Sequence, residues 1–197
     1  MKPLENINTF YAKNSDEWRS WLLENHLTKE SIWLIIYKKE SNIPSVCYQQ
    51  AVDDALCFGW IDSLPNKRND ESYYQFFSKR NPKSNWSKVN KEKVERLLSE
   101  NKMMTQGIKM VQLAKESGTW EALNKVDDLE IPNEMKEFFS KNELARVNFE
   151  NFPASTKRGI LQWIYSAKQH TTKLKRIAET VNLATNNIRA LQYKPKE

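Results

Sequence analysis

Three charged residues stand where predicted strands end, and their types suit the binding of a polar ligand. Asp62 follows the apolar pair WI, Lys38 follows the run WLIIY, and Arg80 follows YYQFF. An arginine can hold a carboxylate or a phosphate bidentately, and an aspartate can act as a general acid or base. Rigid elements with aromatic walls keep such groups in a partly dry setting, where ligands are commonly held.

These residues predict one binding place in the first half of the chain. Its candidate residues are Lys38, Trp60, Asp62, Arg80, Ser84, Trp86 and Asn90. We expect Asp62 and Arg80 to approach each other at the ends of neighbouring strands, with Trp86 or Trp60 as an adjacent wall. A structural interpretation uses the same residues: Asp62 pairs with Arg80 or caps the turn before LPNKRND. The tryptophans then belong to the core. Spacing alone favours this second interpretation.

Several other chemistries are excluded by the glycines. They are widely spaced along the chain, at Gly59, Gly107, Gly118 and Gly159. A Walker loop or a dinucleotide fingerprint needs clustered glycines, because backbone N–H groups must approach phosphates closely. Neither motif is present, and no G-x-S-x-G nucleophile elbow occurs.

The thiols and imidazoles do not predict a metal site. Cys47, Cys57, His26 and His170 lack metal-ligand spacing, so we expect no metal and no cofactor. Cys57 lies late in a predicted helix, where the helix dipole disfavours a thiolate. A buried small side chain is the favoured role for Cys57 over a nucleophile.

The first half predicts a mixture of helices and strands. NSDEWRSWLLENH begins a helix, with Asn14 and Glu17 in a variant of the capping box. SIWLIIYKK is a nearly continuous apolar run that predicts a strand covered on both faces. YQQAVDDALCF predicts a helix with Gly59 at its C′ position. GWIDS begins a second strand, and SYYQFFSKR is a third whose alternation places Arg80 on the face of Tyr74.

The second half predicts helices. Ser87 can cap KVNKEKVERLLSEN, and TQGIKMVQLAKESG ends on Gly118. The polar stretch NKVDDLEIPN predicts a connector over residues 124–132, between an α+β core region over 1–123 and a helical basic region over 133–197 packed on it. The last helix has apolar residues at helical spacing: Leu174, Ile177, Ala178, Val181, Ala184 and Ile188. The fold class is α+β, with a small antiparallel-rich sheet, packed helices and an all-helical C-terminal region.

The basic charge is concentrated near the C-terminus. Residues 157–197 hold nine Lys and Arg against two acidic residues, whereas the rest of the chain holds 22 basic and 23 acidic residues. Lys168, Lys175 and Arg176 lie off the apolar stripe and are the candidates for phosphate contacts. No nucleic-acid-binding signature accompanies them, so a solvated helix face is favoured over a nucleic-acid surface. The chain lacks an apolar run of membrane-spanning length or a signal-peptide pattern, and we expect a cytoplasmic protein.

Several ordered motifs resemble the YdeI/OmpD-associated family, also described as bacteriocin-protection proteins. They are YQQAVDDALCFGWIDS after WLIIYKKES, YYQFFSKRNPKSNWSKVNKEKVERLL, MMTQGIKMVQLAKESGTWE and WIYSAKQHTTKLKRI, so the resemblance spans nearly the whole chain. Lys79 replaces a proline usual in the family, and Thr171-Thr172-Lys173 replaces a Glu-Thr-Arg. The resemblance implies a bacterial protein linked to antimicrobial-peptide or envelope-stress tolerance, with no reaction or catalytic residues to transfer.

Three functional hypotheses follow, and the first is favoured. The protein is a non-enzymatic, stress-associated protein that binds a small anionic ligand or a protein partner. The first alternative is an enzyme in which Asp62 is the acid or base and Arg80 holds an anionic substrate. The second is a nucleic-acid-binding protein that acts through residues 157–197.

Overall fold

The computed structural model describes residues 8–191, and the chain divides into two compact units between Glu121 and Ala122. We call them the first and the second unit. The segment 124–132, predicted as a connector, belongs instead to the second unit. It contains helix α5 (Asn124–Asp127), whose Val126 is 4% exposed within that unit's core. The polar residues around this valine concealed a short helix.

The first unit contains a four-stranded mixed sheet with the strand order β1-β2-β4-β3. β1 is parallel to β2, whereas the β2–β4 and β4–β3 pairs are antiparallel, which confirms the predicted α+β class and its antiparallel-rich sheet. The strands are β1 (Thr9–Tyr11), β2 (Ser31–Tyr37), β3 (Trp60–Lys67) and β4 (Ser72–Lys79). β1 was not predicted, because its three residues are too few for a periodic pattern.

β2 buries only one of its two faces. Ile32, Leu34 and Ile36 are buried, whereas the residues between them are half-buried. The prediction of a strand covered on both faces is therefore wrong. Trp33 lies on the less covered face, where its ring centroid is 4.9 Å from that of Phe76. Aromatic pairing across strands thus accounts for the apolar residues that helices do not cover.

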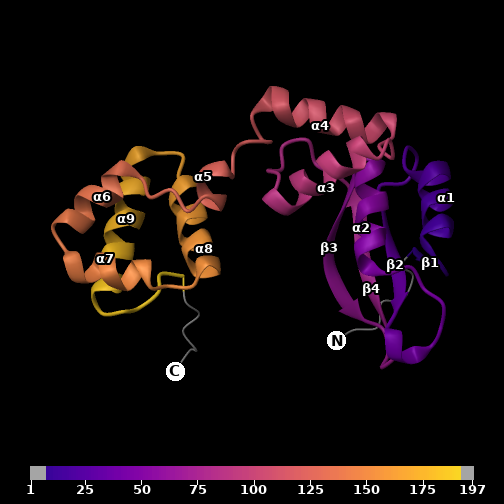
Figure 1. Cartoon of the computed structure of the whole chain (residues 1–197), viewed down its shortest axis with the longest axis horizontal. Coiled ribbons are helices and arrows are strands. Elements are labelled where there is room, and N and C mark those ends of the chain that lie inside the picture. Colours follow the sequence, from indigo (N-terminus) through magenta and orange to yellow (C-terminus); the bar gives the residue numbers. More distant parts are fainter. Residues whose placement is uncertain (1–7, 192–197) are drawn as a thin grey trace. The chain divides into compact units, whose positions relative to one another are not determined.

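Two helices cover the buried face of the sheet, as Figure 1 shows. They are α1 (Ser15–Asn25) and α2 (Tyr48–Cys57). The backbone N–H of Glu17 donates to the Asn14 side chain, which confirms the predicted cap. Trp18 of α1 connects the layers: its Nε1 donates to the Ala51 carbonyl oxygen of α2 at 3.0 Å, and its ring lies 5.2 Å from that of Phe77 in β4.

The end of α2 packs closely against a later helix. Gly59 follows α2 with a φ of 76°, as its predicted C′ position requires. After α3 (Lys88–Ser99), which Ser87 caps as predicted, α4 (Thr105–Ser117) crosses the end of α2. A Cβ atom on Gly107 of α4 would overlap the carbonyl oxygen of Cys57 and lie 2.8 Å from that of Leu56. The two helices can approach this closely only because residue 107 is a glycine.

β3 is irregular in its middle. Its register with β4 shifts between Asp62 and Pro65, and Pro65 lies opposite Gln75. The amide nitrogen of a proline carries no hydrogen, so Pro65 cannot donate to the ladder. The side-chain amide of Gln75 instead donates to the carbonyl oxygen of Ser63 at 2.9 Å.

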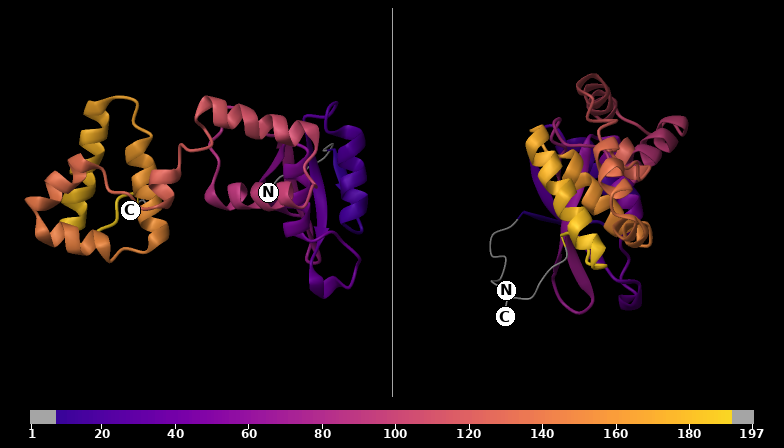
Figure 2. Two further views of the ribbon diagram at one scale, coloured as in Figure 1. Left: turned by 45° about the horizontal axis from the view of Figure 1, so that its top comes forward. Right: turned by 90° about the vertical axis from the view of Figure 1, so that its left-hand side faces the viewer.

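The second unit is helical, as predicted. After α5 its helices are α6 (Asn133–Ser140), α7 (Glu143–Glu150), α8 (Ala154–Tyr165) and α9 (His170–Thr185). Each of α6, α7 and α8 packs against α9 (Figure 2). Ile177, Val181 and Ala184 of α9 are buried, but α9 ends before Ile188, which is 37% exposed. The prediction is therefore right for the middle of this helix and wrong for Ile188.

Candidate functional site

Arg80 directly follows β4 and is almost fully buried, with 6% of its surface exposed. Its backbone N–H donates to the Gly59 carbonyl oxygen at 3.0 Å. The guanidinium carbon lies 3.7 Å from the centroid of the Trp86 ring, and Nη2 donates to the Asn85 carbonyl oxygen at 2.6 Å. Trp86 thus lies beside Arg80, and stacking on it fixes the plane of the guanidinium.

The charge of Arg80 has no anionic partner among residues 8–191. No ion pair of this part of the chain involves Arg80, and its buried Nε has no hydrogen-bond partner. Burial lowers the pKa of Arg80 to about 10, a value at which the side chain is still a cation at neutral pH. A buried charge without a counterion is costly, so an anion bound beside it would offset that cost.

Arg80 lines a cavity of about 500 Å³ within the first unit. Apolar atoms of Leu27, Pro82 and Met110 contribute to its walls, together with Trp60. A second cation lies at its edge, but that charge is compensated. The Lys79 ammonium group donates to Glu30 Oε1 at 2.7 Å and to the Leu27 carbonyl oxygen at 2.9 Å.

The expected approach of Asp62 to Arg80 is wrong. Asp62 is the third residue of a strand that continues to Lys67, and it lies opposite Phe77. Its Oδ2 accepts a hydrogen bond from the Tyr48 hydroxyl at 2.6 Å. Burial, followed by this contact, raises the pKa of Tyr48 to about 12. The aspartate is therefore bound to α2 and does not mark the end of a strand.

The register predicts that Asp62 and Arg80 act independently on stability. Arg80 lies three residues beyond Phe77, which corresponds to roughly 10 Å along a strand. We expect the free-energy changes of Asp62→Asn and Arg80→Lys to add within about 0.5 kcal/mol in urea unfolding of the single and double variants. A coupling above about 1 kcal/mol would contradict this independence.

The remaining candidate residues are only partly brought together. Trp60 is fully buried and lines the Arg80 cavity, with its Nε1 donating to the His26 carbonyl oxygen at 3.2 Å. Ser84 lies in the turn between Arg80 and Trp86, where its hydroxyl donates to the Asn81 carbonyl oxygen.

Lys38 and Asn90 do not line the Arg80 cavity. Lys38 follows β2 at the opposite end of the sheet, since β2 and β4 are antiparallel, and its Nζ donates to the Asp70 carbonyl oxygen at 2.7 Å. Asn90 is in the first turn of α3, where its backbone N–H donates to the Ser87 hydroxyl. Of the candidate residues, Trp60 and Arg80 thus line one cavity, and Trp86 stacks on the Arg80 side chain without lining that cavity.

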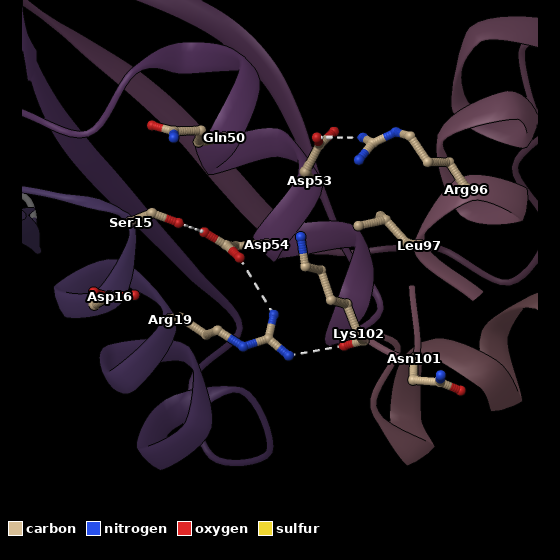
Figure 3. Close-up of a pocket in the computed structure, with 10 residues that line it drawn as sticks. All are labelled: Ser15, Asp16, Arg19, Gln50, Asp53, Asp54, Arg96, Leu97, Asn101 and Lys102. Carbon is tan, nitrogen blue, oxygen red and sulfur yellow. Dashed lines mark hydrogen bonds and ion pairs between the residues drawn. The ribbon is translucent and has the colours of Figure 1, made fainter. Parts of the chain in front are cut away.

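A second polar cavity of about 330 Å³ was not predicted (Figure 3). At its centre is Asp54 of α2, which is 8% exposed. The Ser15 hydroxyl donates to Asp54 Oδ2 at 2.5 Å, and Arg19 Nη1 donates to Oδ1 at 3.2 Å. Arg19 Nη2 also donates to the Lys102 carbonyl oxygen at 2.7 Å. Sequence reasoning missed this network because Arg19 and Asp54 are 35 residues apart and no local pattern pairs them.

The electrostatics of the second cavity are those of a compensated network. Burial raises the pKa of Asp54, although Ser15 and Arg19 act in the opposite direction. The neighbouring Asp53 pairs with Lys93 and with Arg96 (Figure 3 draws the second pair). These ion pairs connect α1, α2 and α3. Because the carboxylates already have partners, this cavity has less uncompensated charge for a ligand to neutralise than the Arg80 cavity has.

Cys57 and Arg176 contact other residues of their own units, in agreement with structural roles. Cys57 is fully buried at the end of α2, as expected, and burial raises the pKa of its thiol. Arg176 donates to the Trp163 carbonyl oxygen and to the Ser166 hydroxyl, and it lies over the Trp163 ring. It is therefore engaged within the second unit, whereas Lys168 and Lys175 are exposed.

Within residues 8–191, the structure contains no group of three or more His, Cys, Asp or Glu side chains placed to hold a metal ion. In the same part of the chain, none of the helices combines the length and the apolar character needed to cross a bilayer.

Comparison with known families finds two matches along the chain. Residues 10–110 match the model of a domain of unknown function (DUF8412), and residues 128–187 match the model described as bacteriocin-protection, YdeI or OmpD-associated. No curated protein and no solved structure matches significantly. The resemblance that the motifs suggested is confirmed for the second unit, but its expected extent was too wide. The motif YQQAVDDALCFGWIDS lies within the other match.

Proposed function

We propose that this chain, which belongs to the DUF8412 family through residues 10–110, is a tolerance-associated binding protein. The match of residues 128–187 to the model described as bacteriocin-protection, YdeI or OmpD-associated supports this proposal. Its first unit binds a small anionic ligand at Arg80. The family description supports a link to the tolerance of antimicrobial peptides, and the Arg80 cavity supports anion binding as the molecular activity. The proposal places this activity in the cytoplasm, where the free thiols of Cys47 and Cys57 would persist.

The observation that carries the proposal is the uncompensated charge of Arg80 at the wall of a cavity. Structural arginines in folded domains usually meet a carboxylate, because a buried guanidinium without a counterion is destabilising. Arg80 has instead one carbonyl acceptor, one aromatic face and an Nε without a partner. An anion in the cavity would supply the missing charge.

Binding is favoured here over acid–base catalysis. The enzyme hypothesis needs Asp62 beside a substrate that Arg80 holds, but Asp62 is bound to Tyr48 and lies along the strand from Arg80. The carboxylate nearest to the cavity cation Lys79 is Glu30, and this ion pair is partly exposed. The two acid–base side chains that line the cavity already have partners, since Glu30 pairs with Lys79 and His26 Nδ1 contacts the Leu22 carbonyl oxygen. The cavity therefore supports a cation that holds an anion.

Replacement of Arg80 by glutamine should separate ligand binding from folding. We expect Arg80→Gln to leave the melting temperature unchanged or to raise it, because an uncompensated buried cation is removed. Small carboxylates and phosphate at constant ionic strength should raise the melting temperature of the wild type. At ten times its dissociation constant, a bound anion adds about 1.4 kcal/mol, or several degrees. Arg80→Gln should lose this response.

Arg158→Gln provides the matched control, because Arg158 is an exposed residue of α8. This variant should keep the full response to anions. The proposal is contradicted if none of the anions stabilises the wild type, or if Arg80→Gln responds as strongly as Arg158→Gln does.

A further inference from the structure

The charges around the Arg80 cavity allow one negative charge in a ligand. Lys79 and Glu30 form an ion pair at 2.7 Å and neutralise each other. Arg80 then remains as the single cation of the cavity wall without a carboxylate among the described residues. A monoanion would balance it, whereas a phosphate dianion would bring a second charge with no cation to meet it.

The size of the cavity favours a ligand larger than an inorganic ion. Its volume of about 500 Å³ lies in the range of cavities that hold whole organic ligands. Acetate or sulfate would leave most of this space filled with water. A Cβ on Gly59 would meet the Met110 side chain at 2.9 Å, so the glycine allows Met110 to pack closely against this part of the wall.

Apolar side chains form much of the remaining wall. Met110 is 6% exposed at the cavity, and Leu27 at its rim exposes 65% of its surface to solvent. Pro82 lines the same cavity. An exposed leucine beside a buried cation is suited to a ligand with an apolar body and a charged head, since burial of that leucine would favour binding.

We propose that the ligand of Arg80 is a monocarboxylate with an apolar or aromatic body. This inference rests on the proposed anion-binding function and adds the chemical class of the ligand. The carboxylate meets the guanidinium, whose plane is fixed by Trp86, and the apolar body lies against Leu27, Pro82 and Met110.

Calorimetric titration of the full chain with five probes tests the ligand class. They are benzoate, 4-methylpentanoate, acetate, inorganic phosphate and the neutral benzamide. We expect the first two to bind at least tenfold more tightly than acetate or phosphate, and benzamide to bind at least tenfold more weakly than benzoate. Equal binding of acetate, phosphate and benzoate would overturn the inference but leave anion binding intact. Failure of all four anions would overturn both proposals.

The variant Leu27→Asn tests the apolar wall, and Leu64→Asn is its control. Leu64 is 73% exposed on β3 and does not line the cavity, so the same substitution there should leave every affinity unchanged. Leu27→Asn should weaken benzoate binding at least fivefold and leave acetate binding within twofold of the wild type. Unchanged benzoate binding in Leu27→Asn, or an equal loss for acetate, would contradict the proposed contact.

Discussion

Replacement of Gly107 by alanine is expected to destabilise the first unit by about 3 kcal/mol or more. The new methyl group would overlap the backbone carbonyl of Cys57, the last residue of α2, whose oxygen is held by a hydrogen bond from the Met104 N–H at 3.0 Å and cannot move away as a flexible side chain could. Relief of the overlap requires α4 to move from the end of α2, which would also disturb Met110 and the Arg80 cavity. Urea unfolding followed by tryptophan fluorescence measures this loss, because six of the seven tryptophans lie in the first unit.

Gly159→Ala is the matched control for Gly107→Ala. Gly159 lies inside α8, and its added Cβ would meet no atom within 4 Å. The intrinsic helix preference of alanine should then raise the stability of the second unit by about 0.5–1 kcal/mol, measured by circular dichroism. If Gly107→Ala were as harmless as Gly159→Ala, the close approach of α2 and α4 would be wrong.

Removal of Arg19 is expected to lower the free energy of unfolding by about 2–3 kcal/mol at neutral pH. This loss is smaller than that for a fully buried ion pair, because the Arg19 side chain is about one-third exposed. Arg19→Met keeps much of the side-chain volume but leaves the Asp54 carboxylate without its cation. Asp54→Asn should cost less, because the neutral amide escapes the desolvation that disfavours the charged form. The double variant should therefore be more stable than Arg19→Met alone.

The dependence on pH identifies Asp54 as the cause. Burial raises the pKa of Asp54, so the folded protein favours the protonated carboxyl group. The stability that this group contributes is fully present below the ordinary carboxyl pKa. It is lost as the pH rises through the pKa of the folded state. Without Arg19 the folded-state pKa rises further. The deficit of Arg19→Met should thus be largest at neutral pH and shrink on acidification, whereas the double variant should show no such change. A deficit that is independent of pH would exclude this explanation.

Sequence periodicity was sufficient for elements that have strong local signals. The caps Asn14, Ser87, Gly59 and Gly118 were placed correctly, because each depends only on residues within one turn of the chain. By contrast, β1 and α5 were missed because they do not depend on local residues alone. β1 exists through pairing with β2, and α5 through packing of Val126, so their stability comes from residues distant in the sequence.

The candidate site was predicted in part. Trp86 or Trp60 was expected as a wall beside Arg80, and Trp86, six positions from Arg80, stacks on it. The environment of Asp62 was not predicted, because a turn was expected at LPNKRND, whereas β3 continues to Lys67 with a shift in register. The contact of Tyr48 with Asp62 and the network of Arg19 with Asp54 depend on how α1 and α2 lie on the sheet, which no local pattern specifies.

The irregular β3 strand also affects how one molecule meets another. β1 and β3 are the outer strands of the described sheet, and an outer strand with free amides can pair with a strand of a second chain. The register shift beside Pro65 interrupts the regular row of amides along β3. β1 offers only three residues on the opposite side. The sheet is thereby protected at both margins from edge-to-edge aggregation, although its less covered face is rich in aromatic side chains.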